Sequence, residues 1–365
     1  MSSIPILRII TLKTQELIHH RVTLYMLQSS LMAHDFIAIG DVVTDEFIEV
    51  KDVRVDTDPD PEDKGYEELC FRFGDKIEYE DAVVVHAVGN AANAAVSATR
   101  LGLDTAYIAD VGSDELGATQ RKTLEATGVD TEYVRVHEGM KSNHHYVLRK
   151  GAERTILIKH HKYPYALPEK LEAPKWFYLS SIGEHDPDYH FKITAYLKEH
   201  PETKLAFQPG SFQIALGPER LKEVYERSEL FFCNKEEAAR ILSDIGDKDV
   251  PTLLKHMREL GPKIVVITDG TAGAYAYDGS EIWHMPIYPD PKPPIDRTGA
   301  GDSFSSTFTA ALALGHDIPT ALAWGPINSM SVVQYIGAQE GLLTQEKLLE
   351  FLKNAPADYS PQKIA

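Results

Sequence analysis

The sequence has little cysteine, fewer bases than acids and no long apolar run. Its 365 residues include only two cysteines, Cys70 and Cys233. They are too few and too far apart for a zinc site or a disulfide framework, and fit a reducing cytoplasm. Lysine and arginine total 37 against 55 aspartates and glutamates, a net charge of −18, which argues against binding to a nucleic-acid backbone. We therefore expect no nucleic-acid partner.

The N-terminal segment differs from the rest of the chain. Residues 4–12 are apolar, but the run is short and contains Pro5 and Arg8, so it cannot span a bilayer and we expect no membrane partner. We expect Met32 to be the working start, with residues 1–31 a disordered or mis-annotated extension. An amphipathic, transit-like segment is the alternative.

From residue 36 onward, short apolar runs alternate with helical segments. The composition is that of an ordinary soluble globular protein, with 43% hydrophobic and 25% charged residues. The pattern predicts strands at 36–39, 105–109, 176–179, 204–207, 230–232 and 263–268. It predicts helices at 115–127, 188–198, 218–226, 235–242 and 250–260. Such alternation implies a mostly parallel sheet covered by helices on both faces.

Two β-rich insertions, residues 46–88 and 133–165, interrupt this alternation. We expect them to form a small second sheet that serves as a lid or as the surface of a homodimer. The first insertion has acids at positions 1, 3, 5 and 12 of a calcium loop, namely Asp56, Asp58, Asp60 and Glu67. Pro61 stands where such a loop needs glycine, so a solvated loop tip is the preferred interpretation.

The second insertion also carries two histidine pairs, His144-His145 and His160-His161. Adjacent residues of a strand point to opposite faces of a sheet. We therefore expect exposed or packed histidines here and not a metal site.

A glycine-rich turn, residues 296–304, leads into an apolar helix. Backbone N–H groups at Gly299, Ala300 and Gly301 would gather where the helix dipole favours an anion. Asp302 in the same turn would repel a phosphate, but it suits a base that accepts a proton during phosphoryl transfer. The alternative is a plain helix cap with an acidic first turn.

Other polar residues follow strand ends, which is where parallel sheets bind ligands. Asp45 lies beyond the strand 36–39 and is a candidate to hold hydroxyl groups, although turn aspartates are common. Asn90 and Asn93 lie near one face of a helix start that follows Gly89, and their amides suit a polyol. Close helix packing with Asn90 as a cap is the alternative.

Two later strand ends carry candidates for a nucleotide and a metal ion. Asn234 can cap the helix after strand 230–232, and Glu237 points toward the same opening, where it would act on magnesium through water. After strand 263–268 comes a tight turn able to approach nucleotide phosphates, with candidates Thr268, Gly270 and Gly273.

Together these pieces resemble the ribokinase-like sugar kinases of the PfkB family over about residues 34–345, in the family's order. Residues 296–302 are similar to the signature Asp-Thr-x-Gly-Ala-Gly-Asp, with Arg297 in place of threonine. Residues 89–93 resemble Gly-Gly-x-x-x-Asn, with Val88 in place of the first glycine. The two later strand ends match the elements Asn-x-x-Glu and Thr-x-Gly-x-x-Gly.

The resemblance implies a three-layer α/β/α ribokinase-like fold, with a mostly parallel central sheet and a small β-sheet lid, in one kinase domain over residues 32–365. ATP with Mg²⁺ would lie across the turn at Gly270. Asp302 would take the proton from a primary hydroxyl, and the N–H groups of the glycine-rich turn would stabilise the transferred group. The sugar would be held under the lid by Asp45, Gly89, Asn90 and Asn93.

Two further points follow from the resemblance. In some relatives a monovalent cation such as K⁺ is held by a residue like Asp296 and by carbonyls near residues 337–339. Residues 208–210, Gln-Pro-Gly, stand where many members carry Asp-Pro-Asn, so a ligand role for that turn is in doubt and we interpret it as a turn only.

Three functions remain open at this point. The first is an ATP-dependent kinase of a sugar such as ribose or fructose, and the second is a nucleoside kinase of the same fold. The third is a catalytically idle relative that binds a sugar or nucleotide and regulates a partner. The presence of Asp302 argues against the third, because a mere binder needs no base.

Overall fold

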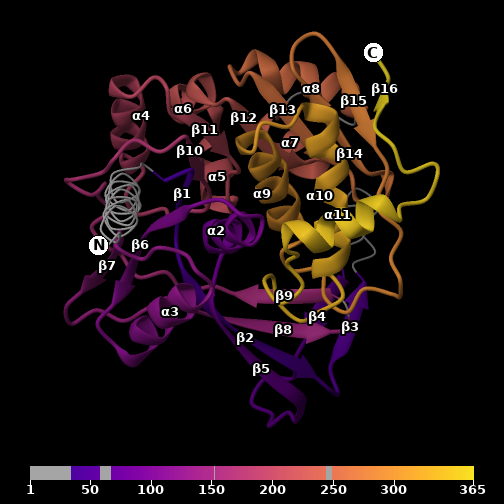
Figure 1. Cartoon of the computed structure of the whole chain (residues 1–365). Coiled ribbons are helices and arrows are strands. Elements are labelled where there is room, and N and C mark those ends of the chain that lie inside the picture. The colour runs from indigo at the N-terminus through magenta and orange to yellow at the C-terminus, as the bar shows by residue number, and fades with distance from the viewer. Residues whose placement is uncertain (1–33, 58–66, 152, 244–248) are drawn as a thin grey trace, which may run out of the picture.

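The chain folds around one large sheet (Figure 1). The computed structural model describes residues 34–57, 67–151, 153–243 and 249–365, so the interpretation of residues 1–31 lies outside the described residues. The sheet has ten strands, in the order β16 (Gln362–Lys363), β15 (Ile282–Met285), β14 (Ala274–Tyr277), β13 (Ile264–Thr268), β12 (Leu230–Asn234), β11 (Lys204–Phe207), β10 (Trp176–Leu179), β1 (Phe36–Ile39), β6 (Thr105–Gly112) and β7 (Val134–His137).

The seven strands from β13 to β7 pair in parallel. Two strands in the middle of this parallel run, β10 and β1, show that the sheet is buried on both faces. All four residues of β1 are buried, and so are all four of β10. Continuous apolar runs of this kind need helices on both faces of the sheet.

Helices cover the sheet on both faces and give the three-layer α/β/α architecture that the sequence predicted (Figure 1). One face packs against α2 (Asn90–Arg100), α9 (Ala300–Ala313), α10 (Ile318–Val332) and α11 (Gln345–Lys353). The other packs against α4 (Tyr189–Glu199), α6 (Lys222–Arg227), α7 (Lys235–Ile241) and α8 (Val250–Glu259). Each face has its own apolar core. The sheet between them holds the strand ends in fixed register.

The structure differs from the predicted pattern beyond the parallel strands. Strand 263–268 was predicted to be the last, yet β14, β15 and β16 continue the sheet in antiparallel fashion. They are short, and β14 alternates buried and partly buried residues, so they lack a long apolar run. The predicted helix 218–226 is two helices, α5 (Ser211–Arg220) and α6, and α5 is kinked at Gly217 with φ +79°.

A second, four-stranded sheet stands apart from the first, and we call it the small sheet. Its order is β5 (Tyr79–Val88), β2 (Val43–Val50), β8 (His144–Lys150) and β9 (Glu153–Leu157). Both predicted insertions contribute strands to it, whereas β7 joins the large sheet. A separate hairpin pairs β3 (Arg54–Thr57) with β4 (Glu67–Cys70). Of the calcium-like spacing, Asp58, Asp60 and Pro61 lie outside the described residues.

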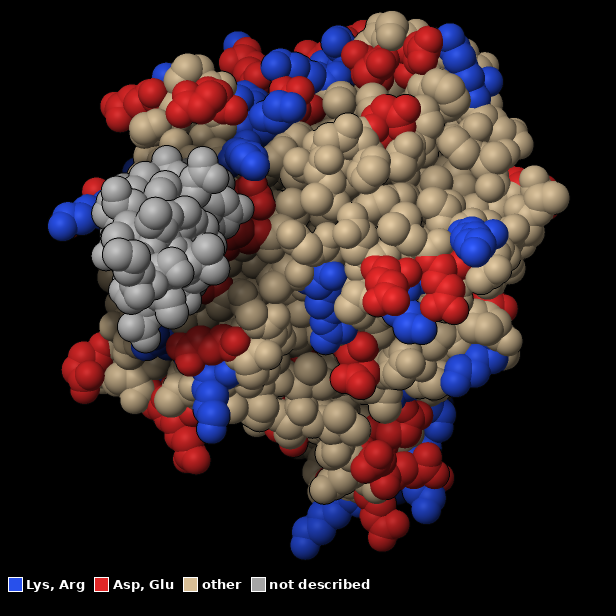
Figure 2. Space-filling view, viewed as in Figure 1, with Lys and Arg blue, Asp and Glu red and all other residues tan. Residues whose placement is uncertain are grey.

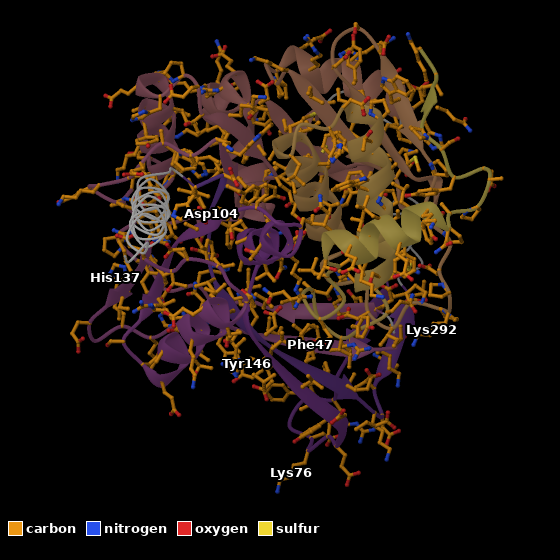
Figure 3. All side chains as sticks on the ribbon, in the orientation of Figure 1. Phe47, Lys76, Asp104, His137, Tyr146 and Lys292 are labelled. Carbon is orange, nitrogen blue, oxygen red and sulfur yellow. The ribbon has the colours of Figure 1, made fainter. Side chains whose placement is uncertain are left out.

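The two faces of the small sheet have different surroundings (Figure 3). Phe47 on one face is 2% exposed, whereas Tyr146 on the other is 44% exposed. Asp45 pairs in register with His145 of β8, and residues two apart share a face, so both lie on the same face as Phe47. That face is turned toward the rest of the molecule.

The surface carries charges of both signs. On the face shown in Figure 2, Lys and Arg side chains lie interspersed with Asp and Glu. Within the part of the chain that the structure describes, we find no helix long and apolar enough to cross a membrane.

Candidate active site

A cavity of about 620 Å³ opens at the carboxyl ends of the large sheet's parallel strands, and the small sheet supplies its opposite wall. The residues that the sequence singled out and that line it are Asp45, Gly89, Asn90, Asn93, Asn234, Glu237, Thr268, Gly270, Gly299, Gly301 and Asp302. Segments more than 200 residues apart in the chain therefore meet here. Ala300, Gly273 and Asp296 do not line the cavity.

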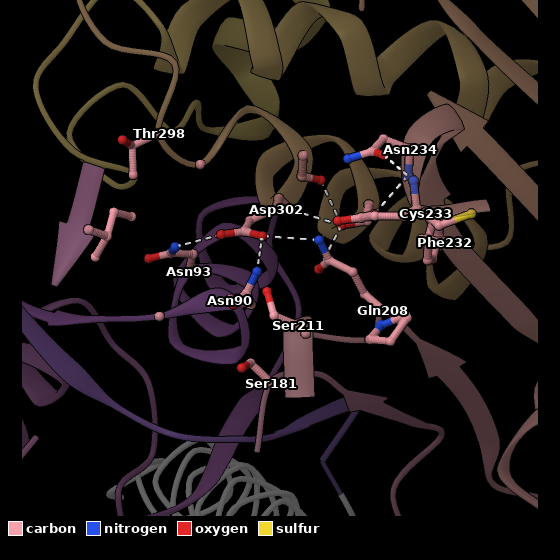
Figure 4. Close-up of a pocket in the computed structure, with 18 of the residues that line it drawn as sticks. Asn90, Asn93, Ser181, Gln208, Ser211, Phe232, Cys233, Asn234, Thr298 and Asp302 are labelled. Carbon is pink, nitrogen blue, oxygen red and sulfur yellow. Dashed lines mark hydrogen bonds between the residues drawn. The ribbon is translucent and has the colours of Figure 1, made fainter. Parts of the chain in front are cut away.

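Asp302 is the centre of a hydrogen-bond network (Figure 4). It lies in the first turn of α9 and is 8% exposed. Its Oδ1 accepts hydrogen bonds from Asn90 Nδ2 at 2.8 Å and Gln208 Nε2 at 3.0 Å, and its Oδ2 accepts one from Asn93 Nδ2 at 2.8 Å. Three neutral amides thus fix the carboxylate without neutralising its charge.

The first turn of α2 supplies two of these amides. Gly89 is the N-cap of α2 with φ +115°, a conformation that favours glycine, and a Cβ there would lie 2.7 Å from the Asp41 carbonyl oxygen. The alternative of Asn90 as a cap is wrong, because Asn90 is the first helical residue and its side chain reaches Asp302 instead. Its position follows from the tight turn at Gly89.

Gln208 is a site residue that the sequence interpretation missed. It follows β11, and its side-chain carbonyl accepts hydrogen bonds from the hydroxyls of Tyr178 and Ser305. Burial raises the pKa of the Tyr178 hydroxyl well above its ordinary value, so this hydroxyl stays a donor. The turn at 208–210 is therefore more than a turn, and its place at a strand end was the available signal.

The glycine-rich turn is held from behind. Gly299 has φ +80°, and a Cβ there would lie 2.3 Å from Ala338 Cβ. Asp296 is fully buried: its Oδ1 accepts from the Thr298 backbone N–H and hydroxyl, and its Oδ2 accepts from the Gly337 N–H at 2.9 Å. These contacts hold the turn against residues 337–338 and direct the start of α9 at the cavity.

Asn234 and Glu237 form a capping box at the start of α7, as expected for the asparagine. Asn234 Oδ1 accepts from the Glu237 N–H at 2.8 Å, and Glu237 Oε2 accepts from the Asn234 N–H at 2.9 Å. Burial raises the pKa of the Glu237 carboxyl, and the charges of Asp302 and Glu236 act in the same direction. This corner of the cavity is rich in negative charge, which suits a cation with oxygen ligands.

The residues of the turn after β13 have two different roles. Thr268 and Gly270 line the cavity. Gly273 instead has φ +95°, and a Cβ there would lie 2.2 Å from the Met285 carbonyl oxygen, so this glycine permits close packing on β15. Two of the three predicted residues therefore face the cavity directly.

The opposite wall carries acids and histidines. Asp45 is 7% exposed and faces His145 across β2 and β8, with Asp45 Oδ1 3.3 Å from His145 Nδ1. Beside them His160 lines the cavity, with its Nδ1 2.7 Å from Asp41 Oδ2. We had expected exposed or merely packed histidines, and Asp41 was not singled out at all. Side-chain orientation, which a sequence does not give, decides both cases.

Comparison with known proteins fits this geometry. A model of the pfkB family carbohydrate kinases matches residues 62–345. The ribokinase of Bacillus subtilis (strain 168) is 27% identical over 276 residues, covering 72% of this chain and 87% of that protein. A nucleoside kinase of Methanothermobacter thermautotrophicus is 25% identical, covering 70% of this chain and 80% of that protein.

A solved structure supports the same fold. Arabidopsis thaliana ribokinase, complexed with ribose and ATP, superposes with a TM-score of 0.72 at 19% identity, covering 88% of this chain and 99% of that one. The fold is therefore the ribokinase fold, and the chemistry of its family is transfer of a phosphoryl group to an alcohol. The chain belongs to the pfkB family of carbohydrate kinases.

Proposed function

We propose that this kinase transfers the γ-phosphate of ATP to a primary hydroxyl of a ribose- or fructose-like sugar, with Asp302 as the base. The observation that carries the proposal is the convergence of three amides on Asp302. A carboxylate held in this way is oriented, and it has no ion-pair partner among the described residues, as a base for a hydroxyl proton requires.

The start of α9 supplies the anion site in this proposal. The first N–H groups of a helix have no intrahelical acceptor, and Gly299 and Gly301 line the cavity beside Asp302. Their N–H groups, with that of Ala300, would stabilise charge on the transferred phosphoryl group. The Ala300 nitrogen donates a long hydrogen bond, 3.5 Å, to the Arg297 carbonyl oxygen, which a phosphoryl oxygen would replace in this proposal.

ATP and Mg²⁺ would occupy the side of the cavity near β12 and β13. The nucleotide would approach Asn234, Thr268 and Gly270, with Gly273 shaping the turn. Burial, and after it the charges of Asp302 and Glu236, raise the pKa of Glu237, and a nearby cation would offset both effects. When bound, Mg²⁺ would offset the charge of the phosphates, and Glu237 would orient its water.

The acceptor would lie between Asp302 and the small sheet, held by Asp45, Gly89, Asn90 and Asn93. The small sheet would serve as the lid that keeps water from competing as the acceptor. Asp296 is the candidate for a monovalent cation site, because its carboxylate can accept more than the three hydrogen bonds it already receives. Homodimerisation through the lid, a K⁺ requirement and a cytoplasmic location stay predictions.

An ATP-consumption panel tests the proposal. The acceptors are ribose, fructose, 2-keto-3-deoxygluconate, adenosine, inosine and cytidine, each with Mg²⁺ and with or without K⁺. We expect turnover with a free sugar. Preference for a nucleoside would assign the second function, and tight binding without turnover of any member would favour the idle binder.

A further inference from the structure

Two imidazole rings lie side by side on the cavity wall that faces the large sheet. The centroids of His145, from β8, and His160, which follows β9, are 5.1 Å apart. Both residues line the cavity, and the chemistry proposed for Asp302 uses neither. Each ring has a carboxylate behind it, so the wall contains two aspartate–histidine pairs.

The pair at His160 is firmly anchored. Asp41 is 4% exposed and accepts hydrogen bonds from the Tyr165 hydroxyl at 2.6 Å and the Gly183 N–H at 2.9 Å, besides its contact with His160 Nδ1. This carboxylate fixes the ring and favours a proton on Nδ1. The edge of the ring packs against Phe212. Nε2 is then left for a ligand.

The pair at His145 is incomplete. His145 is 9% exposed, and among the described residues its buried Nε2 has no hydrogen-bond partner. Asp45 Oδ1 is also buried, and its contact with His145 Nδ1 does not reach hydrogen-bond geometry within the described part of the chain. Leaving such groups unpaired is costly, so both atoms indicate a missing ligand.

We propose that His145 and His160 determine acceptor specificity by binding hydroxyl groups at the end of the substrate remote from the phosphorylated one. The inference rests on the proposed kinase function and names its acceptor class, an uncharged polyol. A hydroxyl group both donates and accepts, so one group can satisfy an aspartate oxygen and an imidazole nitrogen together.

The charges around this wall disfavour an acidic acceptor. Asp41, Asp45 and Asp302 all line the cavity, and a phosphate or carboxylate on the substrate would be repelled by them. Arg154 of β9 and Arg297 of the glycine-rich turn also line the cavity, but both are exposed residues. Two solvated guanidinium groups would offset little of the repulsion that three buried carboxylates exert.

The test is calorimetric binding to the full chain with a non-hydrolysable ATP analogue and Mg²⁺. The probes are ribose, 2-deoxyribose, fructose, fructose 6-phosphate and 2-keto-3-deoxygluconate. The variants are His145→Gln and His160→Gln. The neighbouring residues supply matched controls, His144→Gln and His161→Gln, because neither His144 nor His161 lines the cavity.

We expect a neutral sugar to bind most tightly. Loss of one hydrogen bond to a buried partner should weaken its Kd about tenfold in His145→Gln and in His160→Gln, and less than about twofold in the controls. Thermal unfolding checks that each variant is folded. Tighter binding of either acidic probe, no binding of any probe, or equal Kd values in all four variants would overturn the inference.

ADP release, measured on the same variants and sugars with ATP in place of the analogue, separates this inference from the kinase proposal. A sugar that binds through both histidines but is not phosphorylated would overturn the kinase proposal and leave the inference standing. A sugar that is phosphorylated with unchanged affinity in both cavity variants would do the reverse.

Discussion

The two walls of the cavity differ in how they are built. The large-sheet wall, which we define as Asn234, Glu237, Thr268, Gly299 and Asp302, stands on buried strands and helix starts. Within it Asn234 and Glu237 are hydrogen-bonded to each other, and Asp302 accepts a hydrogen bond from the adjacent Gln208. The small-sheet wall, defined as Asp45, His145, Arg154, Ile156 and the adjoining His160, includes the exposed strand β9. In our proposals the first wall carries the phosphoryl transfer and the second selects the acceptor.

Replacing the proposed base should lower activity more than any other change to the large-sheet wall. In Asp302→Asn the carboxylate is lost, and kcat should fall by about three orders of magnitude or more with ATP affinity nearly unchanged, because the base acts mainly in the transition state. Steady-state kinetics and nucleotide titration measure both. Retained turnover would remove Asp302 from this role.

Closing the space behind the glycine-rich turn should have the next largest effect. Gly299→Ala puts a methyl group against Ala338 at positive φ, which we expect to cost about 3 kcal/mol of unfolding free energy. Gly315→Ala is the control, because Gly315 also has positive φ (+90°) but a Cβ there meets nothing within 4 Å, and it should cost about 1 kcal/mol. Equal losses in denaturant titrations would contradict the close approach.

Gln208 sharpens the comparison, since it donates a hydrogen bond to the proposed base, Asp302. Gln208→Leu removes one of the three amides on Asp302 and should lower kcat about tenfold with little change in the KM for ATP. Gln208→Glu should move the acidic limb of the pH–rate profile upward, because two facing carboxylates favour a shared proton. An unshifted profile in Gln208→Glu would argue that the two side chains are apart during turnover.

The smallest effect should appear in stability. Burial raises the pKa of Glu237 in the folded protein. The charged carboxylate therefore lowers the free energy of unfolding, and this loss is complete once the pH has risen through the folded-state pKa. At a pH below the unfolded-state pKa the carboxyl is protonated in both states and the loss disappears. Glu237→Gln keeps the cap acceptor and should raise Tm by about 1–3 °C at pH 7.5.

That gain should vanish near pH 4, where carboxyls are largely protonated. The exposed neighbour supplies the control: Glu236→Gln removes only a minor repulsion on Glu237 and should raise Tm by less than Glu237→Gln does. Melting of ligand-free protein across this pH range makes the measurement. A gain that does not change with pH would show that burial of the charge is not its cause.

The sequence predicted the large-sheet wall better than the small-sheet wall, for a physical reason. β1, β10 and β11 fall at the residues predicted from their apolar runs. A glycine-rich turn with an acid at a helix start is likewise recognisable from neighbouring residues alone. Gln208 was missed because its role depends on Tyr178 and Asp302, which are remote in the chain.

The histidines of the small-sheet wall show the same limit. The period of two correctly indicated that His144 and His145 face opposite ways, and the register of β8 with β2 places His145 beside Asp45. No local pattern indicates which of the two faces meets a cavity. His160 and Asp41 come together from separate segments, so their pairing depends on the tertiary structure and not on a local sequence pattern.

One kinetic comparison tests this division of labour most directly. Asp302→Asn and His160→Gln are measured with the best acceptor at saturating ATP. We predict that Asp302→Asn loses kcat while the affinity for the acceptor is kept, and that His160→Gln raises the acceptor KM about tenfold with kcat nearly unchanged. The account would be contradicted if both variants changed the same constant, or if Asp302→Asn turned over at the native rate.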